Sequence, residues 1–272
     1  MRPSCVNNKK SGRGIVYTHD MSDLTPLLGA IAGGLFPALA WLWFWRREDA
    51  PHPEPRRLIA LAFFAGMLTV ALVIPMQQCV AGSVQYSFLP MQSACSFLAS
   101  FLPTTTAIFI AWSTIEEVMK YLLARITVLR SREDDEPIDP VIYMVAVALG
   151  FAAAENTLFL ISPLAGDSLL QTIMTGNLRF VGATLLHVLA SAVIGVAIAL
   201  AFYGSPAKKR LFTTLGVILA CVLHSMFNFL ILNTAEEYLL RTFGIVWLGL
   251  ILLLAVLEYV KRIHPKVTRS FP

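Results

Sequence analysis

The stretch "FIAWSTIEEVMKYLLARITVL" (Phe109–Leu129) is apolar at both ends and carries Glu116, Glu117 and Lys120 at its centre. As a helix it is long enough to cross the ~30 Å of hydrocarbon in a bilayer. Ionisable side chains inside such a helix are unfavourable in lipid, and they indicate a functional site by default. The stretch therefore predicts a membrane-spanning helix with a buried polar site.

The composition predicts an all-α, polytopic membrane protein. Of the 272 residues, 57% are hydrophobic and 14% are charged, and the mean hydropathy is +0.69. Soluble domains average about 45–50% apolar and about 25% charged residues, so this chain has too little polar surface for water. The apolar runs are continuous rather than alternating. This excludes a strand barrel and predicts a transmembrane helical bundle.

Seven apolar runs have the length of a membrane span, and we expect them to form a single domain over residues 24–262. The shorter run Phe88–Leu102 is bracketed by prolines and is interpreted as a re-entrant or interfacial segment, with an eighth span as the alternative. Residues 1–23 form a polar tail, and residues 263–272 form a basic tail. The seven expected spans are Leu24–Trp45, Leu58–Val80, Thr105–Leu129, Val141–Ile161, Phe180–Tyr203, Leu211–Leu232 and Leu239–Val260.

Basic residues concentrate in the loops on one side of the expected bundle, whereas the opposite loops contain only Arg179. By the positive-inside rule the N-terminus lies outside and the C-terminus in the cytoplasm. The polar N-terminal tail disagrees, because it carries four basic residues on the outer side; a natural start at Met21 would leave residues 1–20 non-native. Anionic lipid and topology account for the basic loops, so no nucleic-acid partner is indicated.

Two of the four cysteines, Cys79 and Cys95, fall near the outer end of the second span. An oxidising compartment would let them form a disulfide. The alternative is that both are small buried hydrophobic residues. Cys5 and Cys221 are solitary in the sequence.

Polar side chains occur in the middle of four successive spans. Counted at ~1.5 Å of helical rise per residue, the ionisable ones lie about 20 Å from the cytoplasmic side in each span. We therefore expect them to meet in one layer around a hydrated chamber, although polar residues in membrane helices also serve as interhelical contacts. The set comprises Glu116, Glu117, Lys120, Glu155, Asn156, His187, Ser191, His224 and Asn228.

Such a layer contains the groups needed to hydrolyse an amide inside a membrane. A buried carboxylate can take a proton from water, and His and Asn donors can stabilise an oxyanion. Neither a Gly-x-Ser-x-Gly elbow nor an HExxH motif is present. The paired glutamates and the asparagine slightly favour activation of water without a metal. A divalent metal such as zinc stays open, with His187, His224, Glu117 and Glu155 as candidate ligands.

Four short motifs, in this order on successive spans, carry a family resemblance. The set resembles the PrsW-type intramembrane proteases and, more distantly, the superfamily of CAAX-prenyl proteases and bacteriocin-processing enzymes. The resemblance implies an endopeptidase of a bacterial cytoplasmic membrane with a core in residues 105–232. Its substrate would be a membrane-anchored protein such as an anti-sigma factor. The motifs are "EEVMK" (Glu116–Lys120), "FAAAE" (Phe151–Glu155), "HVLAS" (His187–Ser191) and "HSMFN" (His224–Asn228).

The resemblance also implies a role for each motif residue. Glu116 or Glu117 would activate water, His187 and His224 would assist, and Asn228 would help to bind the oxyanion. Glu155 stands where the wider superfamily commonly has a histidine, so it is either catalytic or orients a partner. The supporting residues are Lys120, as a counter-ion to the glutamates, together with Phe151, Glu155 and Ser191.

Two other classes of membrane protein would also use buried polar groups. A proton- or ion-coupled transporter builds relays from carboxylates and histidines, but neither an inverted repeat nor paired interrupted helices are evident here. A non-enzymatic scaffold would use the same groups only for packing. A zinc-dependent membrane hydrolase would use them as ligands. The oligomeric state is not indicated by the sequence.

Overall fold

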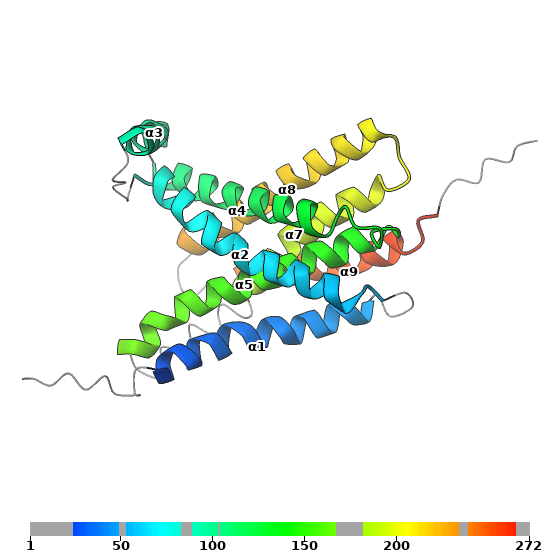
Figure 1. Ribbon diagram of the computed structural model, residues 1–272, viewed down its shortest axis with the longest axis horizontal. Helices are drawn as coiled ribbons and strands as arrows, with labels where there is room; N and C mark the ends of the chain where they lie inside the picture. Colours follow the sequence, from blue (N-terminus) through cyan, green and yellow to red (C-terminus); the bar gives the residue numbers. More distant parts are fainter. Residues whose placement is uncertain are drawn as a thin grey trace, which may run out of the picture.

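A computed structural model describes residues 24–48, 53–82, 89–102, 104–166, 182–233 and 239–264. Eight helices and no strand occur in these ranges (Figure 1), which confirms the all-α class. The polar N-terminal tail, Cys5 and Arg179 lie outside the described residues. The helices are α1 (Leu24–Glu48), α2 (Arg56–Val80), α3 (Leu89–Ser100), α4 (Thr105–Thr127), α5 (Asp139–Gly166), α7 (Thr184–Leu200), α8 (Pro206–Asn233) and α9 (Leu239–Val260).

Helix α5 forms the centre of the bundle and contacts α1, α2 and α7. Every residue from Val141 to Ala153 is buried. Most of the apolar side chains belong to the main hydrophobic core, whereas Phe151 packs in a second cluster with Val70 and Val73. Two glycines let the backbones of α2 and α5 approach closely. A Cβ atom on Gly150 would lie 1.8 Å from the carbonyl oxygen of Phe63, and one on Gly66 would lie 1.9 Å from that of Val147. Small residues commonly permit such contacts between membrane helices.

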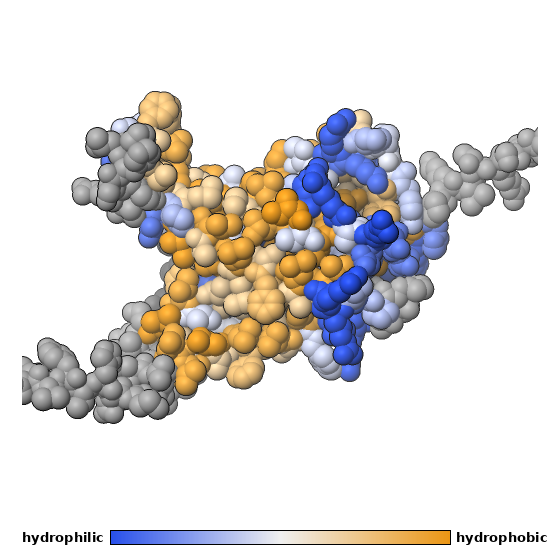
Figure 2. Space-filling model, in the orientation of Figure 1, coloured by the Kyte–Doolittle hydropathy of each residue, from blue (hydrophilic) through white to orange (hydrophobic). Residues whose placement is uncertain are grey.

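The remaining helices surround α5. Helix α4 packs between α2 and α8, α7 packs between α5 and α8, and α9 packs on α7. Helices α1, α2, α5, α8 and α9 are long and apolar enough to cross a membrane; α7 is apolar but shorter. Figure 2 shows hydrophobic residues over most of the visible surface and hydrophilic residues gathered at one end, here called the basic end. The chain is thus a helical, multi-pass membrane protein.

The helices differ at their ends from the spans expected from hydropathy. Helix α8 begins at Pro206, so its first turns contain the basic residues Lys208, Lys209 and Arg210, which the sequence analysis placed in a loop. Helix α5 extends beyond the expected Ile161 to Gly166. Hydropathy finds the apolar part of a helix, whereas backbone hydrogen bonding continues into polar residues.

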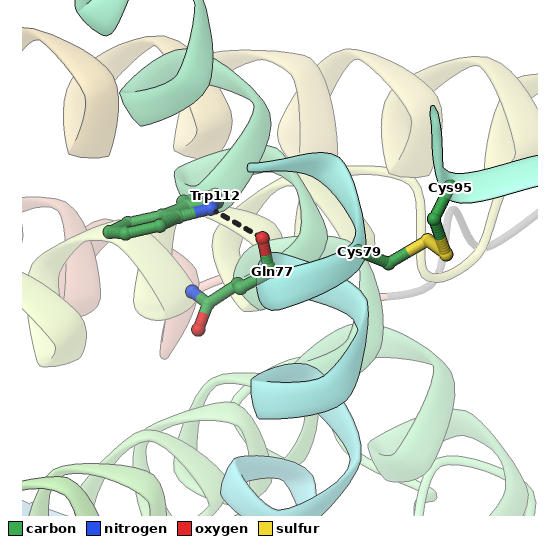
Figure 3. The surroundings of a disulfide bond; sticks show 4 residues. All are labelled: Gln77, Cys79, Cys95 and Trp112. Carbon is green, nitrogen blue, oxygen red and sulfur yellow. Dashed lines mark hydrogen bonds between the residues drawn. A yellow bond between two sulfur atoms is a disulfide. The ribbon is translucent and has the colours of Figure 1, made fainter. Parts of the chain in front are cut away.

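The short helix α3 lies across the end of α2 rather than alongside it (Figure 1). Its 12 residues give a length of about 18 Å, which is too short to cross ~30 Å of hydrocarbon. The disulfide Cys79–Cys95, with a Cα–Cα distance of 4.8 Å, ties α3 to α2 (Figure 3). The structure thus contains the Cys79–Cys95 disulfide that an oxidising compartment would allow.

At the basic end, the loop between α4 and α5 is held by polar contacts. The Asp139 Oδ2 atom accepts the backbone N–H groups of Asp135 and Glu136. The Arg57 guanidinium contacts the Glu133 carboxylate at 2.8 Å, and Tyr143 donates to Glu54. These contacts fix the ends of α2, α4 and α5 relative to one another.

Candidate active site

The polar residues of α4 lie on its buried face. Ser113, Glu116, Glu117 and Lys120 are all buried, and their spacing of three or four residues places them on one side of a helix. The helix begins at the N-cap Thr104, whose side chain accepts the backbone N–H of Ala107 at 3.2 Å. Helix α4 thus directs Glu116, Glu117 and Lys120 into the bundle.

Glu117 is fully buried and has both carboxylate oxygens occupied. Its Oε1 atom accepts from Lys120 Nζ at 2.5 Å and lies 2.7 Å from His224 Nδ1. Its Oε2 atom accepts from Ser191 Oγ at 3.1 Å. Glu117 therefore links α4, α7 and α8, and a buried charge with this many partners is well compensated.

Glu116 differs from Glu117 in having one unused oxygen. Its Oε1 atom accepts from Gln77 Nε2 at 2.8 Å. Its Oε2 atom is buried and makes no hydrogen bond within the described part of the chain; it lies 3.7 Å from His224 Nε2. Because the Nδ1–H group of His224 donates to the Glu117 carboxylate, the Nε2 atom carries no proton and keeps its lone pair. Two basic atoms therefore face each other across a small gap.

His187 lies beside this gap and is held on both sides. Its Nε2 atom is 3.0 Å from Glu155 Oε2, and its Nδ1 atom is 3.3 Å from Lys120 Nζ. An ammonium group only donates, so Nδ1 accepts and the Nε2–H group donates to Glu155. The ring centroids of His187 and His224 are 5.0 Å apart, which brings the two imidazoles together as the sequence predicted.

Lys120 and Phe151 complete the cluster. The Lys120 ammonium is fully buried and lies 4.6 Å from the centroid of the Phe151 ring, a distance typical of a cation–π contact. The Phe151 ring also contacts His187, with a centroid distance of 4.9 Å. Lys120 is thus surrounded by a carboxylate, an imidazole and an aromatic ring.

The two asparagines lie at the margin of the cluster. Asn228 donates to Ser113 Oγ at 3.0 Å, which joins α8 to α4 one turn away from Glu117. Asn156 is buried and donates to Thr184 Oγ1 at 2.9 Å, which joins α5 to α7. The second contact is interhelical packing of the kind common in membranes.

Gln77 is a site residue that the sequence analysis missed. It is the first of two glutamines that end the apolar run of α2, a position that hydropathy assigns to the membrane boundary. Trp112 Nε1 donates to the backbone oxygen of Gln77 at 3.0 Å (Figure 3), while the side chain reaches Glu116. The sequence feature that could have indicated this residue is the glutamine pair at the end of an otherwise apolar helix.

The donor atoms in the cluster fit a metal. Among the described residues, ligand atoms of Glu116, His187 and His224 all lie within 4.8 Å of one another. Two imidazoles and a carboxylate are the ligand set of many catalytic zinc sites, and the contact from Glu117 to His224 Nδ1 is the usual outer support for such a ligand. The ligands expected from the sequence include Glu117 but not Glu116. The geometry favours the reverse, because the oxygens of Glu117 are already engaged.

Comparison with known proteins matches residues 54–257 to the PrsW family intramembrane metalloproteases. The chain belongs to this family. The match includes Gln77, Cys79 and every residue of the cluster. The transporter and scaffold alternatives are thus set aside, and the chain is an intramembrane protease that hydrolyses peptide bonds.

Curated relatives support the same family. Protease PrsW of Bacillus subtilis is 24% identical over 224 residues, which cover 81% of this chain and 92% of the relative. Protease PrsW of Oceanobacillus iheyensis is 26% identical, covering 84% of this chain and 94% of the relative. Protease PrsW of Geobacillus kaustophilus is 26% identical, covering 76% of this chain and 81% of the relative. No solved structure matches the chain.

Proposed function

We propose that the chain is a metal-dependent endopeptidase that cuts a membrane-anchored protein inside the cytoplasmic membrane of a bacterium. Glu116 and His224 would hold a divalent ion such as zinc. His187 would join them through Nδ1, in place of the contact of that atom with Lys120, while its Nε2–H group stays on Glu155. The observation that carries the proposal is the buried, unpartnered Oε2 atom of Glu116, which faces His224 Nε2 at 3.7 Å. A carboxylate oxygen left without a partner in a dry interior is unfavourable unless it has a ligand.

The neighbouring residues would keep this geometry. Glu117 accepts from His224 Nδ1 and so keeps the Nε2 lone pair of that histidine directed at the gap. Gln77 donates to one oxygen of Glu116 and leaves the other available. A divalent ion supplies a Lewis acid and an activated water nucleophile.

Glu155 is the carboxylate best placed to move protons. Its side chain is 21% exposed, more than Glu116 or Glu117, and it contacts His187. A partly exposed carboxylate can exchange protons with solvent. We assign it the uptake of the proton from water and the delivery of a proton to the leaving amine. The residue that departs from the wider superfamily would therefore still serve in the reaction.

The alternative is hydrolysis without a metal, in which Glu116 itself takes a proton from water. The same gap between Glu116 and His224 favours it, because a water molecule there would contact both basic atoms. The two mechanisms differ in one observable quantity, namely the metal content of the purified protein.

The test uses purified protein, a single-span membrane substrate and elemental analysis. We expect about one bound divalent ion per chain and loss of cleavage with a chelator, restored by adding the metal. Glu116→Gln and His224→Ala should lose both metal and cleavage, whereas the control Glu258→Gln, an exposed carboxylate on α9, should retain both. A metal-free protein that cleaves in the presence of chelator would reject the metal and leave the glutamate mechanism.

The proposed topology has seven spans, with the N-terminus outside and the C-terminus in the cytoplasm. Support comes from the hydrophilic residues gathered at one end of the bundle (Figure 2) and from the positive-inside rule. An anti-sigma factor is the substrate that the family resemblance suggests. Reporter fusions at residue 204 and at the C-terminus should both report a cytoplasmic location. An outside location for either would overturn the topology.

A further inference from the structure

A cavity of about 690 Å³ opens between α4 and α8 at the basic end of the bundle. Its mouth is lined by Tyr121, Arg125, Lys209 and Arg210. A second cavity, of about 280 Å³, shares the first three of these residues and adds Arg130 and Asp134. The two cavities together form one depression, which we call the basic pocket. It is separate from the active site, because it lies at the end of α4 and not at its centre.

The basic pocket carries an excess of positive charge. Arg125 donates to the hydroxyl group of Tyr121 at 2.7 Å, and the Lys209 ammonium lies 5.4 Å from the centroid of the Phe202 ring. In the ranges that the structure describes, no carboxylate forms an ion pair with any of the four lining cations, Arg125, Arg130, Lys209 and Arg210. Four cations on one depression repel one another unless an anion is present.

The start of α8 strengthens this preference for an anion. Lys208, Lys209 and Arg210 occupy its first turns, and no acidic residue accompanies them. The N-terminus of a helix carries a partial positive charge, so cations there are unfavourable and an anion is stabilised. The helix dipole and the side chains therefore select for the same kind of ligand.

Asp134, the acidic residue of the pocket, offsets little of this charge near neutral pH. Burial, together with the neighbouring Asp139 carboxylate, raises the pKa of Asp134 to about 7, although the Lys209 ammonium opposes the shift. A large part of the Asp134 carboxyl is thus protonated at pH 7. The pocket keeps a net positive charge in both forms of this group.

The pocket continues into an apolar groove along the lipid-facing side of α4 and α8. A further cavity of about 500 Å³ shares Val118, Val217 and Ile218 with the basic pocket and extends past Cys221 to Ser225. Ile218 is 54% exposed, so this wall faces the hydrocarbon of the membrane. A charged mouth followed by an apolar groove matches a headgroup followed by an acyl chain.

We propose that this site binds one anionic phospholipid, with its phosphate at Arg125, Lys209 and Arg210 and an acyl chain in the groove between α4 and α8. Basic pockets between membrane helices are known to hold anionic headgroups. A transmembrane segment of a substrate fits less well, because segments that flank membrane helices on the cytoplasmic side carry Lys and Arg, which the pocket would repel. The charge of the mouth thus decides between the two occupants.

The lipid would have a structural consequence for the enzyme. Helices α4 and α8 carry Glu116 and His224 on their inner side, and the groove lies between the same helices on their outer side. A phospholipid that contacts both helices would stabilise the separation of the two active-site residues. This consequence is independent of whether the active site uses a metal.

The test is native mass spectrometry of the purified full chain in detergent, titrated with phosphatidylglycerol and separately with phosphatidylcholine. We expect one phosphatidylglycerol bound in preference to phosphatidylcholine. The double variant Arg125→Gln/Lys209→Gln should bind it roughly thirtyfold more weakly, at about fivefold for each charge removed. Arg56→Gln, which removes an exposed charge from the same end of the molecule, is the matched control. Should the double variant fail to fold, the exposed Arg210→Gln replaces it, with an expected weakening of about fivefold.

A second variant tests the groove without changing any charge. Ile218→Trp fills the groove below the mouth and should reduce phosphatidylglycerol binding at least tenfold, whereas a site for free phosphate would be unaffected. Equal binding of phosphatidylglycerol by wild type and Ile218→Trp would overturn the proposal. A loss of binding in the Arg56→Gln control as large as that in the double variant would also overturn it. Unchanged lipid binding in the double variant, with a raised KM for substrate, would assign the groove to the substrate instead.

Discussion

Helices α4 and α5 are both buried in the bundle but use opposite kinds of side chain. The middle of α5 buries apolar residues on all sides, and its glycine lets the backbone of α2 come into contact. The buried face of α4 carries two carboxylates and an ammonium group. In α5 stability comes from packing, whereas in α4 each buried charge depends on its partners. We propose that the chemistry takes place at Glu116, where one of those partners is missing.

The largest expected effect comes from filling the contact between α2 and α5. In Gly150→Ala, the new methyl group would meet the backbone oxygen of Phe63 at 1.8 Å, and backbone cannot move aside as a flexible side chain can. We expect loss of folded, monodisperse protein on size-exclusion chromatography. The control Gly244→Ala, on α9, meets nothing within 4 Å and should behave as wild type. Normal yield of Gly150→Ala would mean that α5 does not pack as described.

The second effect should separate Glu117 from Glu116. In Glu117→Gln the buried Lys120 loses its charged partner, and breaking a buried pair costs about 3–5 kcal/mol. We expect the melting temperature to fall by roughly 10 °C and cleavage to be lost. In Glu116→Gln cleavage should also be lost. When both proteins are measured in chelator, its melting temperature should be unchanged or higher than that of the wild type, because a buried carboxylate oxygen without a hydrogen bond is removed.

A double variant checks the cause of this instability. Glu117→Gln/Lys120→Met removes both members of the ion pair, and it should recover part of the lost melting temperature without recovering cleavage. If Glu117→Gln alone has the same melting temperature as the wild type, the pair contributes no stability and the contrast between the two glutamates disappears.

The third effect concerns Gln77, which contacts Glu116 from outside α4. Loss of a hydrogen bond to a charged group is worth about 1.5–3 kcal/mol, so Gln77→Ala should lower kcat roughly tenfold to a hundredfold. KM should change little, because the side chain positions Glu116 and does not contact substrate. The melting temperature should fall by several degrees, because the same hydrogen bond contributes to stability. Met76→Ala, which removes an exposed side chain from the same helix end, is the matched control. A change in KM alone would assign Gln77 to substrate binding.

The sequence predicted the helical class, because it depends on local pattern; the count of seven spans stays a prediction. The same pattern places the polar residues at a similar depth, and the structure brings most of them into contact. Residues four apart on one helix must share a face, as His224 and Asn228 do. The sequence did not distinguish Glu116 from Glu117. Adjacent residues point about 100° apart, and only the packing of α7 and α8 decides which carboxylate meets Ser191 and His224.

Gln77 could not be predicted for a related reason. Its contact joins residues 39 positions apart, and no local rule connects α2 with the centre of α4. The short helix α3 shows the same limit in another form. Its length excludes a straight span, but its position across the end of α2 depends on the Cys79–Cys95 disulfide, which the sequence allowed without requiring.

The smallest expected effect tests a second carboxylate with an unpartnered oxygen, at the basic end. The Oδ1 atom of Asp134 is buried and has no hydrogen bond within the described residues, and burial raises the pKa of this group to about 7. In the unfolded chain the pKa of an aspartate is ~3.9. Between about pH 4 and pH 7 the folded state therefore holds a proton that the unfolded state lacks. The stability of the protein then falls as the pH rises through this window.

Asp134→Asn removes the group that titrates while keeping its size. We expect the melting temperature to rise by roughly 2–4 °C at pH 8, where the native carboxylate is charged, and to stay nearly unchanged at about pH 3.5, which is below the pKa of this group in both the folded and the unfolded chain. Thermal melts of both proteins at the two pH values measure the difference, and an equal shift at both would show that Asp134 does not titrate in this range. Unlike Glu116→Gln, this variant should keep full cleavage activity. An unpartnered carboxylate oxygen would then matter for catalysis only where it also faces the two histidines.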